Sequence, residues 1–192
     1  MSLTIPNALT LFRIIAIPLI VAIYFTDIQF KSWICVILFS LAGISDALDG
    51  YLARKWNQTS KLGAFLDPVA DKLLVCIMLI IIATNFELRS SLWSVYATLV
   101  TIIVIISREI TVSALREWMA ELGKRSNVAV SNVGKFKTGM QMGAIGCLLF
   151  GKSFIGLPVV LIGETLLYIA GVLTVWSMTI YLIAAYKAVN ED

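Results

Sequence analysis

Long apolar segments constrain this chain more than any other feature of its sequence. A helix needs about 20 mostly apolar residues to cross a bilayer. The sequence offers six segments of roughly that kind: Leu9–Phe25, Trp33–Ala53, Pro68–Thr84, Leu92–Leu115, Phe136–Phe150 and Pro158–Tyr186. A mean hydropathy of +0.92 and a charged fraction of 14% exclude an ordinary soluble domain. The sequence therefore predicts an all-α integral membrane protein with six transmembrane helices in one domain, residues 1–192.

The basic residues predict how these segments lie across the membrane. If the N-terminus is cytoplasmic, all of the 15 Lys and Arg residues fall on or near the inner side except Lys31, Arg89 and Lys152. Loops on the cytoplasmic side of membrane proteins are enriched in Lys and Arg. This distribution predicts that both termini are cytoplasmic, and for a bacterial chain it predicts the inner membrane.

Two pairs of aspartates occur at the ends of apolar segments. Asp46 and Asp49 are three residues apart, and Asp67 and Asp71 are four apart, so each pair projects from one face of its own helix. Carboxylates this close repel each other unless a cation lies between them. The chain has no His, so we expect an oxygen-preferring ion, Mg²⁺ or Mn²⁺, and four carboxylates suit two such ions. A structural ion-pair network, or the lining of an ion pathway, is the alternative.

Small residues flank these aspartates. Gly50 and Ala53 share the helix face of Asp46 and Asp49, and Gly63 lies one turn before Asp67. Without bulky side chains, a phosphate or nucleotide can approach the helix backbone at these positions. The neighbouring Arg54 has the forked donors that bind phosphate. We therefore expect an anionic phosphate compound to bind beside the carboxylates.

Together these residues form the pattern D-x-x-D-G-x-x-A-R, eight further residues, and G-x-x-x-D-x-x-x-D, with every specified position occupied between Asp46 and Asp71. The pattern resembles the signature of the CDP-alcohol phosphotransferases, membrane enzymes that move a substituted phosphate from a CDP-linked donor to an alcohol. The resemblance implies that Asp46, Asp49 and Asp67 are metal ligands. It also implies that Asp71 lies at the metal site and is the catalytic general base. Members of the family are usually homodimers, so a homodimer is expected.

The first apolar segment opens with a further motif, P-N-x-L-T-x-x-R, which is similar to the start of many bacterial members of that family. Asn7, Thr10 and Arg13 are then candidates for contact with the CDP group. The alternative is structural: Asn7 caps the helix and Arg13 extends to the lipid headgroups.

A second group of basic residues lies on later segments. Arg108 and Arg116 end the fourth segment, and Lys135 and Lys137 begin the fifth within G-K-x-K-T. All four are expected at the cytoplasmic side, where they would bind the phosphate of an acceptor. If the segment is helical, the two lysines point to different faces, so one of them would contact substrate. The alternative is a stabilising pair between Glu109 and Arg116.

Other small residues predict packing. The three cysteines are isolated within apolar segments and match no metal or redox spacing: Cys35, Cys76 and Cys147. Three glycines of the fifth segment share a face that predicts close helix packing: Gly139, Gly143 and Gly146.

The expected activity is phosphatidyl transfer from CDP-diacylglycerol to glycerol 3-phosphate at the cytoplasmic face, with release of CMP. The G-K-x-K-T segment resembles members of the family with this acceptor, and the basic residues suit a phosphorylated alcohol. A related transferase that uses phosphatidylglycerol, inositol phosphate or serine is an alternative. A small ion transporter or channel is an alternative of another class. No nucleic-acid partner is expected.

Overall fold

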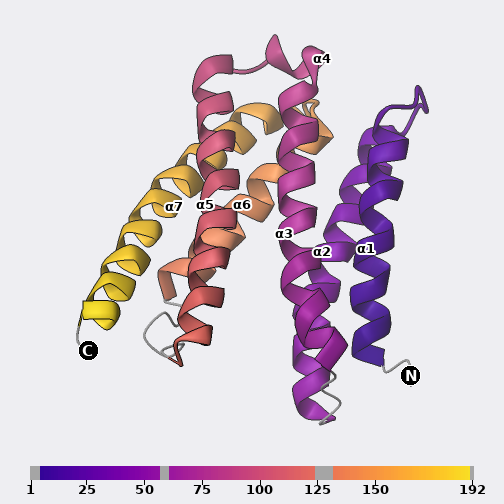
Figure 1. Ribbon diagram of the computed structural model, residues 1–192. Coiled ribbons are helices and arrows are strands. Elements are labelled where there is room, and N and C mark those ends of the chain that lie inside the picture. The colour runs from indigo at the N-terminus through magenta and orange to yellow at the C-terminus, as the bar shows by residue number, and fades with distance from the viewer. Residues whose placement is uncertain (1–4, 57–60, 124–131, 191–192) are drawn as a thin grey trace.

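The computed structural model describes residues 5–56, 61–123 and 132–190. Within these ranges there is no β-strand, and the chain forms six long helices and one short one (Figure 1). Their bounds are α1 Ile5–Tyr24, α2 Lys31–Lys55, α3 Lys61–Thr84, α4 Phe86–Arg89, α5 Val95–Glu121, α6 Asn132–Phe150 and α7 Val159–Asn190. The predicted all-α class is therefore confirmed.

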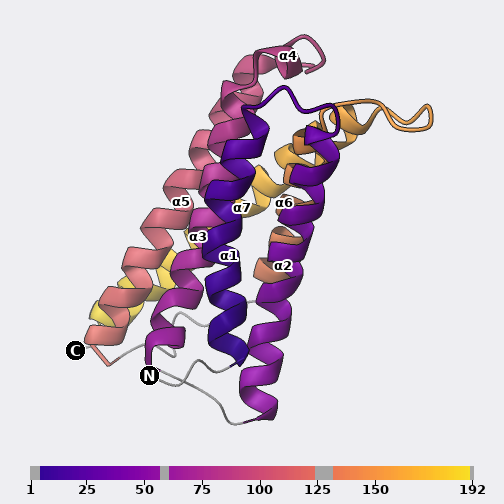
Figure 2. The same ribbon diagram turned by 90° about the vertical axis from the view of Figure 1, so that its right-hand side faces the viewer.

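The long helices run alternately up and down, so the two ends of the chain lie at the same end of the bundle. Figures 1 and 2 show this end, called here the terminal end, and the opposite end, which carries the short helix and is called here the α4 end. The helices α1 to α3 and α5 to α7 coincide with the six predicted segments. In the described part of the chain, three of them are long and apolar enough to cross a membrane: Asn7–Tyr24, Val95–Glu121 and Val159–Asn190.

The helix α3 begins well before its apolar segment. The third segment was expected to start near Pro68, but α3 starts at Lys61 and contains Pro68. Asp67 and Asp71 therefore lie well inside one continuous helix, and the site includes a full turn of helix before them.

Local signals explain several helix ends. The Ser94 side chain accepts a hydrogen bond from the Ala97 N–H at 3.3 Å and caps α5, and Asn85 caps α4 in the same way through Leu88. The helix α6 ends where Gly151 adopts a φ of 65°, a left-handed conformation that suits glycine at a helix C-terminus. The Gly151 N–H bonds the Cys147 carbonyl at 3.2 Å.

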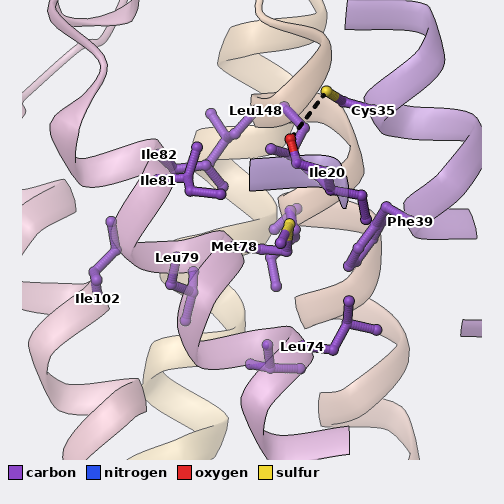
Figure 3. Close-up of a cluster of buried hydrophobic side chains, with 14 of the residues drawn as sticks. Ile20, Cys35, Phe39, Leu74, Met78, Leu79, Ile81, Ile82, Ile102 and Leu148 are labelled. Atoms are coloured by element: carbon purple, nitrogen blue, oxygen red, sulfur yellow. Dashed lines mark hydrogen bonds between the residues drawn. The ribbon is translucent and has the colours of Figure 1, made fainter. Parts of the chain in front are cut away.

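A buried apolar core joins the helices toward the α4 end. Figure 3 shows Ile20 of α1 and Phe39 of α2 beside Met78 of α3 and Leu148 of α6, and all four are at most 2% exposed. The Cys35 thiol donates to the Ile20 carbonyl at 3.9 Å and is otherwise a small packing residue, as predicted. Because lipid is as apolar as these side chains, the core stabilises the bundle by close packing more than by removal from water.

Two glycines of α7 lie at close helix contacts, and the expected glycine face on α6 does not. In the described structure, no heavy atom lies within 4 Å of a Cβ built at Gly139 or Gly146, and at Gly143 the nearest atom is an ordinary 3.5 Å away. On α7, a Cβ at Gly163 would lie 2.7 Å from the Cys147 Cβ, and one at Gly171 would lie 2.6 Å from Thr101. Glycine spacing on α6 could not reveal this, because the partner helix decides which face is crowded.

A buried carboxylate fixes α5 against α7 at the α4 end. Glu164 of α7 is 1% exposed and accepts the N–H groups of Trp93 and Ser94 at 2.7 and 3.0 Å, just before α5 begins. The hydroxyls of Thr98 and Tyr168 also bond to it, at 3.0 and 2.5 Å. A negative charge at a helix N-terminus is favourable, and four hydrogen bonds offset the cost of its burial.

Substitution of the crowded glycine should destabilise the protein, whereas substitution of an uncrowded one should not. Gly163→Ala pushes a Cβ against the Cys147 side chain and the Leu148 backbone, so we expect a loss of about 1–3 kcal/mol. Gly146→Ala is the matched control and should be neutral, or stabilising by up to about 1 kcal/mol from helix propensity. Thermal unfolding of both variants in detergent measures this. Equal effects would contradict the crowding at Gly163.

Candidate functional site

The helix α1 supplies Arg13, which contacts both aspartates of the first acidic pair, Asp46 and Asp49. Arg13 is 0% exposed. Its Nη1 lies 2.8 Å from Asp46 Oδ1, and its Nη2 donates to Asp49 Oδ2. Asp49 is buried as well, while Asp46 stays partly open to solvent. The three-residue spacing on α2 thus presents both carboxylates to one guanidinium, and the alternative that Arg13 extends to the headgroups is wrong.

Thr10 brings the second acidic pair to the same place. It lies one turn before Arg13 on α1, and its Oγ1 donates to Asp67 Oδ1 at 2.5 Å. Asp67 belongs to α3, one turn after the buried Gly63. Consequently, one face of α1 holds carboxylates from both α2 and α3.

Asp71 lies between this acidic group and a second cluster. It is half-buried one turn after Asp67 and is within electrostatic reach of Asp46 and Arg13 in the first group and of Glu109 in the second. The next residue, Lys72, donates to the Ser113 hydroxyl of α5. The helix α3 therefore connects the acidic motif with the end of α5.

The second cluster is basic, with one carboxylate at its centre. Glu109 Oε1 lies 2.5 Å from the Lys137 Nζ of α6 and 3.2 Å from the Arg108 Nη1 of α5. Lys137 is 2% exposed and Arg108 is 8% exposed. The expected alternative pair between Glu109 and Arg116 is therefore wrong. Helical spacing permitted it, but Glu109 bonds with its neighbour on α5 and with a lysine from another helix.

Two polar residues of α7 complete this cluster, and sequence reasoning missed both. Ser177 accepts a hydrogen bond from Arg108 Nη2 at 3.2 Å, and the Tyr181 hydroxyl accepts one from Arg116 Nη2 at 2.8 Å. The available signal was a polar pair four residues apart within an apolar helix. The apolar length of that segment predicts a membrane span, but it does not predict which face of the helix turns toward α5.

Several predicted site residues fall outside what the structure describes. The backbone of α2 includes Gly50, Ala53 and Arg54, and that of α6 includes Lys135, but the surroundings of these four residues lie outside the described part of the structure. Asn7 lies half-buried near the start of α1. The predicted roles of all these residues in binding CDP or acceptor stay predictions.

The donor set fits a divalent metal ion in its chemistry. Asp46, Asp49 and Asp67 offer carboxylate oxygens from two helices that face the same turn of α1, as Mg²⁺ and Mn²⁺ prefer. The described side chains contain no group of three or more His, Cys, Asp or Glu residues already gathered around one point. Instead the Arg13 guanidinium supplies positive charge between Asp46 and Asp49, and its buried Nε has no hydrogen-bond partner among the described residues. A bound cation would share or replace that charge.

A cavity of about 510 Å³ lies elsewhere, at the α4 end. Its lining includes Tyr24, Asn85, the half-buried Lys31 and the exposed Glu87. None of the aspartates of the motif lines it, so it is not the candidate site.

The family model for CDP-alcohol phosphatidyltransferase matches residues 3–176. With the acidic motif in place on α2 and α3, the chain belongs to this family, and it is thus a membrane transferase of phospholipid biosynthesis. Among curated proteins, the CDP-diacylglycerol–glycerol-3-phosphate 3-phosphatidyltransferase of Yersinia enterocolitica is 46% identical over 191 residues, which cover 100% of both chains. The protein of the same name from Haemophilus influenzae is 47% identical over 193 residues, covering 100% of this chain and 98% of that one. The one from Shigella flexneri is 45% identical over 185 residues, 96% of each chain.

Removal of Arg13 tests whether it acts in place of a cation. Arg13→Ala leaves Asp46 and Asp49 facing each other without their positive partner, and breaking a buried ion pair costs about 3–5 kcal/mol. Thermal unfolding in detergent should show this loss, and millimolar Mg²⁺ should restore more stability to the variant than to the wild type. Adding Asp49→Asn to Arg13→Ala removes the repulsion and should recover part of the stability without Mg²⁺. A variant as stable as the wild type would contradict the charge compensation.

Proposed function

We propose that this protein transfers the phosphatidyl group of CDP-diacylglycerol to glycerol 3-phosphate, forming phosphatidylglycerophosphate and CMP. Full-length relatives at 45–47% identity carry the name of this reaction. The observation that carries the proposal within the site is the place of Asp71, between the acidic motif and the basic cluster of Arg108, Arg116, Lys137 and Glu109. A carboxylate between a donor site and an acceptor site is where a general base is needed.

The acidic motif forms the donor half of the site in this proposal. Asp46, Asp49, Asp67 and Asp71 would hold two divalent ions, Mg²⁺ or Mn²⁺. Such ions would neutralise charge on the pyrophosphate and orient it. Arg54 would bind a pyrophosphate oxygen, and Gly50, Ala53 and Gly63 would leave room for the CDP group. Asn7, Thr10 and Arg13 would support this half from α1, with Thr10 and Arg13 orienting the carboxylates they already contact.

The basic cluster forms the acceptor half. Arg108, Arg116 and Lys137, with Lys135 as a further candidate, would bind the phosphate of glycerol 3-phosphate. Asp71 would accept the proton of the attacking hydroxyl as its oxygen bonds to the phosphorus of the phosphatidyl group. The bond from that phosphorus to the bridging oxygen of the pyrophosphate breaks, and CMP leaves with the electron pair.

The charge of the cluster separates this proposal from a neutral acceptor. Three cationic side chains and one carboxylate give a net charge of about +2, which matches a phosphate monoester with about −1.5 to −2 and suits serine poorly. Inositol phosphate and phosphatidylglycerol remain as outcomes of the test below. The alternative hypothesis of an ion channel is not supported, because the chain belongs to a transferase family.

An acceptor panel tests the function directly. Purified protein with CDP-diacylglycerol and Mg²⁺ should release CMP with glycerol 3-phosphate, and much less with phosphatidylglycerol, inositol phosphate or serine. Chelation should abolish the reaction, and Mg²⁺ or Mn²⁺ should restore it. Asp67→Asn should lower kcat by roughly 10²–10³, as when an electrostatic catalytic group is removed. Faster turnover with another acceptor would overturn the choice of glycerol 3-phosphate, and full activity without metal would overturn the metal role.

We also propose that all six long helices cross the bacterial inner membrane and that the terminal end faces the cytoplasm. In this topology, 12 of the 15 basic residues would fall on or near the cytoplasmic side, as is typical of cytoplasmic loops. Single cysteines placed at positions 57–61, in a background without Cys35, Cys76 and Cys147, should react with an impermeant thiol reagent only from the cytoplasmic side. Cysteines at positions 27–31 should react from outside. The reverse pattern would contradict both the orientation and the placement of the site.

The homodimer expected from the family stays a prediction, which light scattering on the detergent-solubilised protein measures.

A further inference from the structure

Two residues of α7 hold the arginines of α5. Ser177 and Tyr181 are four residues apart, so they lie on the same face of the helix. Arg108 Nη2 bonds the Ser177 hydroxyl at 3.2 Å and Arg116 Nη2 bonds the Tyr181 hydroxyl at 2.8 Å. The guanidinium carbons of Arg116 and Arg108 also lie 5.0 and 5.7 Å from the centre of the Tyr181 ring, within the range of cation–π attraction. One tyrosine therefore contacts both arginines.

Tyr181 is itself held firmly. It is 4% exposed and packs with Val112 and Met119 of α5 and Ala185 and Ala188 of α7 in a small apolar cluster. A ring fixed in this way cannot rotate freely, so its hydroxyl is a fixed acceptor for Arg116. A long arginine side chain that would otherwise sample many rotamers is thus confined before any ligand arrives.

Arg116 differs from the other cations of the basic cluster. Arg108 and Lys137 both bond Glu109, whereas Arg116 has no salt-bridge partner within the described residues. The Nε atoms of Arg108 and Arg116 are both buried without a hydrogen-bond partner in that same part of the chain. Each arginine therefore has one N–H donor without a partner among the described residues. No described carboxylate balances the charge of Arg116. Together these features indicate an anionic ligand.

We propose that Tyr181 is a positioning residue of the acceptor site: its hydroxyl and ring hold the Arg116 guanidinium, beside Arg108, in the orientation that binds the acceptor's phosphate. The proposal rests on the proposed function for the identity of the acceptor. It gives α7 a role in substrate selection in addition to its role as a membrane helix. Tyr181 touches the arginines and not the substrate, so its effect should appear in acceptor binding.

Tyr181→Phe separates the hydroxyl from the ring. The variant keeps the apolar packing and the cation–π contact but loses the acceptor for Arg116. We expect the KM for glycerol 3-phosphate to rise roughly tenfold, the low end of what a hydrogen bond to a charged group contributes. The KM for CDP-diacylglycerol should stay within about twofold, because that substrate binds at the acidic motif. Tyr168→Phe is the matched control, since it removes a hydroxyl from the same helix that bonds Glu164 far from the cluster; it should leave both KM values unchanged.

A double-mutant cycle distinguishes positioning from general stabilisation. Arg116→Ala alone should raise the KM for glycerol 3-phosphate roughly ten- to a hundredfold. Tyr181→Phe added to Arg116→Ala should then cause little further change, because the residue it positions is gone. An equal effect of Tyr181→Phe in both backgrounds, or an equal rise in the KM values of both substrates, would overturn the proposal.

Binding of inorganic phosphate gives a reading that does not depend on turnover. Phosphate should raise the unfolding temperature of the wild type and of Tyr168→Phe at concentrations roughly tenfold lower than those that Tyr181→Phe requires. If the wild type prefers another acceptor in the panel, the proposed function fails while this titration still decides the role of Tyr181. The same phosphate dependence in wild type and Tyr181→Phe would overturn that role.

Discussion

Arg13 is fully buried, and the charge it carries has to be compensated where water has no access. The compensation comes from Asp46 and Asp49 on α2, and the neighbouring turn of α1 binds Asp67 on α3 through Thr10. Each carboxylate needs a positive or hydrogen-bonding partner as much as the arginine needs an anion. Removal of the arginine would leave these carboxylates without their positive partner, and removal of the carboxylates would leave a buried positive charge. This small network therefore fixes how the first three helices pack together. The rest of the site depends on that geometry.

The acidic and basic halves of the site share the helix α3. Asp67 bonds toward α1, Lys72 bonds toward Ser113 of α5, and Asp71 lies between them, within electrostatic reach of Arg13 and Glu109. In the proposed function, metal ions held by the carboxylates would balance the pyrophosphate of the donor, and cations of the protein would bind the phosphate of the acceptor. A single helix between the two groups would limit their mutual neutralisation and leave Asp71 within electrostatic reach of both.

The long helix α7 stabilises α5 at two heights. Near the α4 end, Glu164 binds the N–H groups before α5 and gives the helix a buried negative cap. Near the terminal end, Ser177 and Tyr181 bond the two arginines of α5. Between these points, Gly171 lets α7 approach Thr101 closely. Polar contacts of this kind are more important in a membrane, because contact between apolar surfaces alone gives little driving force for helix association there.

The sequence by itself determined the helical class, the place of the six long helices and the acidic motif that identifies the family. These features depend on short-range patterns: apolar run length, the spacing of Asp46 and Asp49, and that of Asp67 and Asp71 along one helix. The sequence also predicted that basic residues of α5 and α6 lie together. The structure brings Arg108 and Lys137 to one carboxylate, and their role in binding an acceptor stays a prediction. It did not show that Arg13 pairs with the motif, that Glu109 bonds Arg108 and Lys137, or that Ser177, Tyr181 and Glu164 take part at all. Each of these contacts joins residues on different helices, or depends on which face a helix turns to its neighbour. Only the packing of the helices in three dimensions decides that, because in an apolar segment every face is equally compatible with lipid.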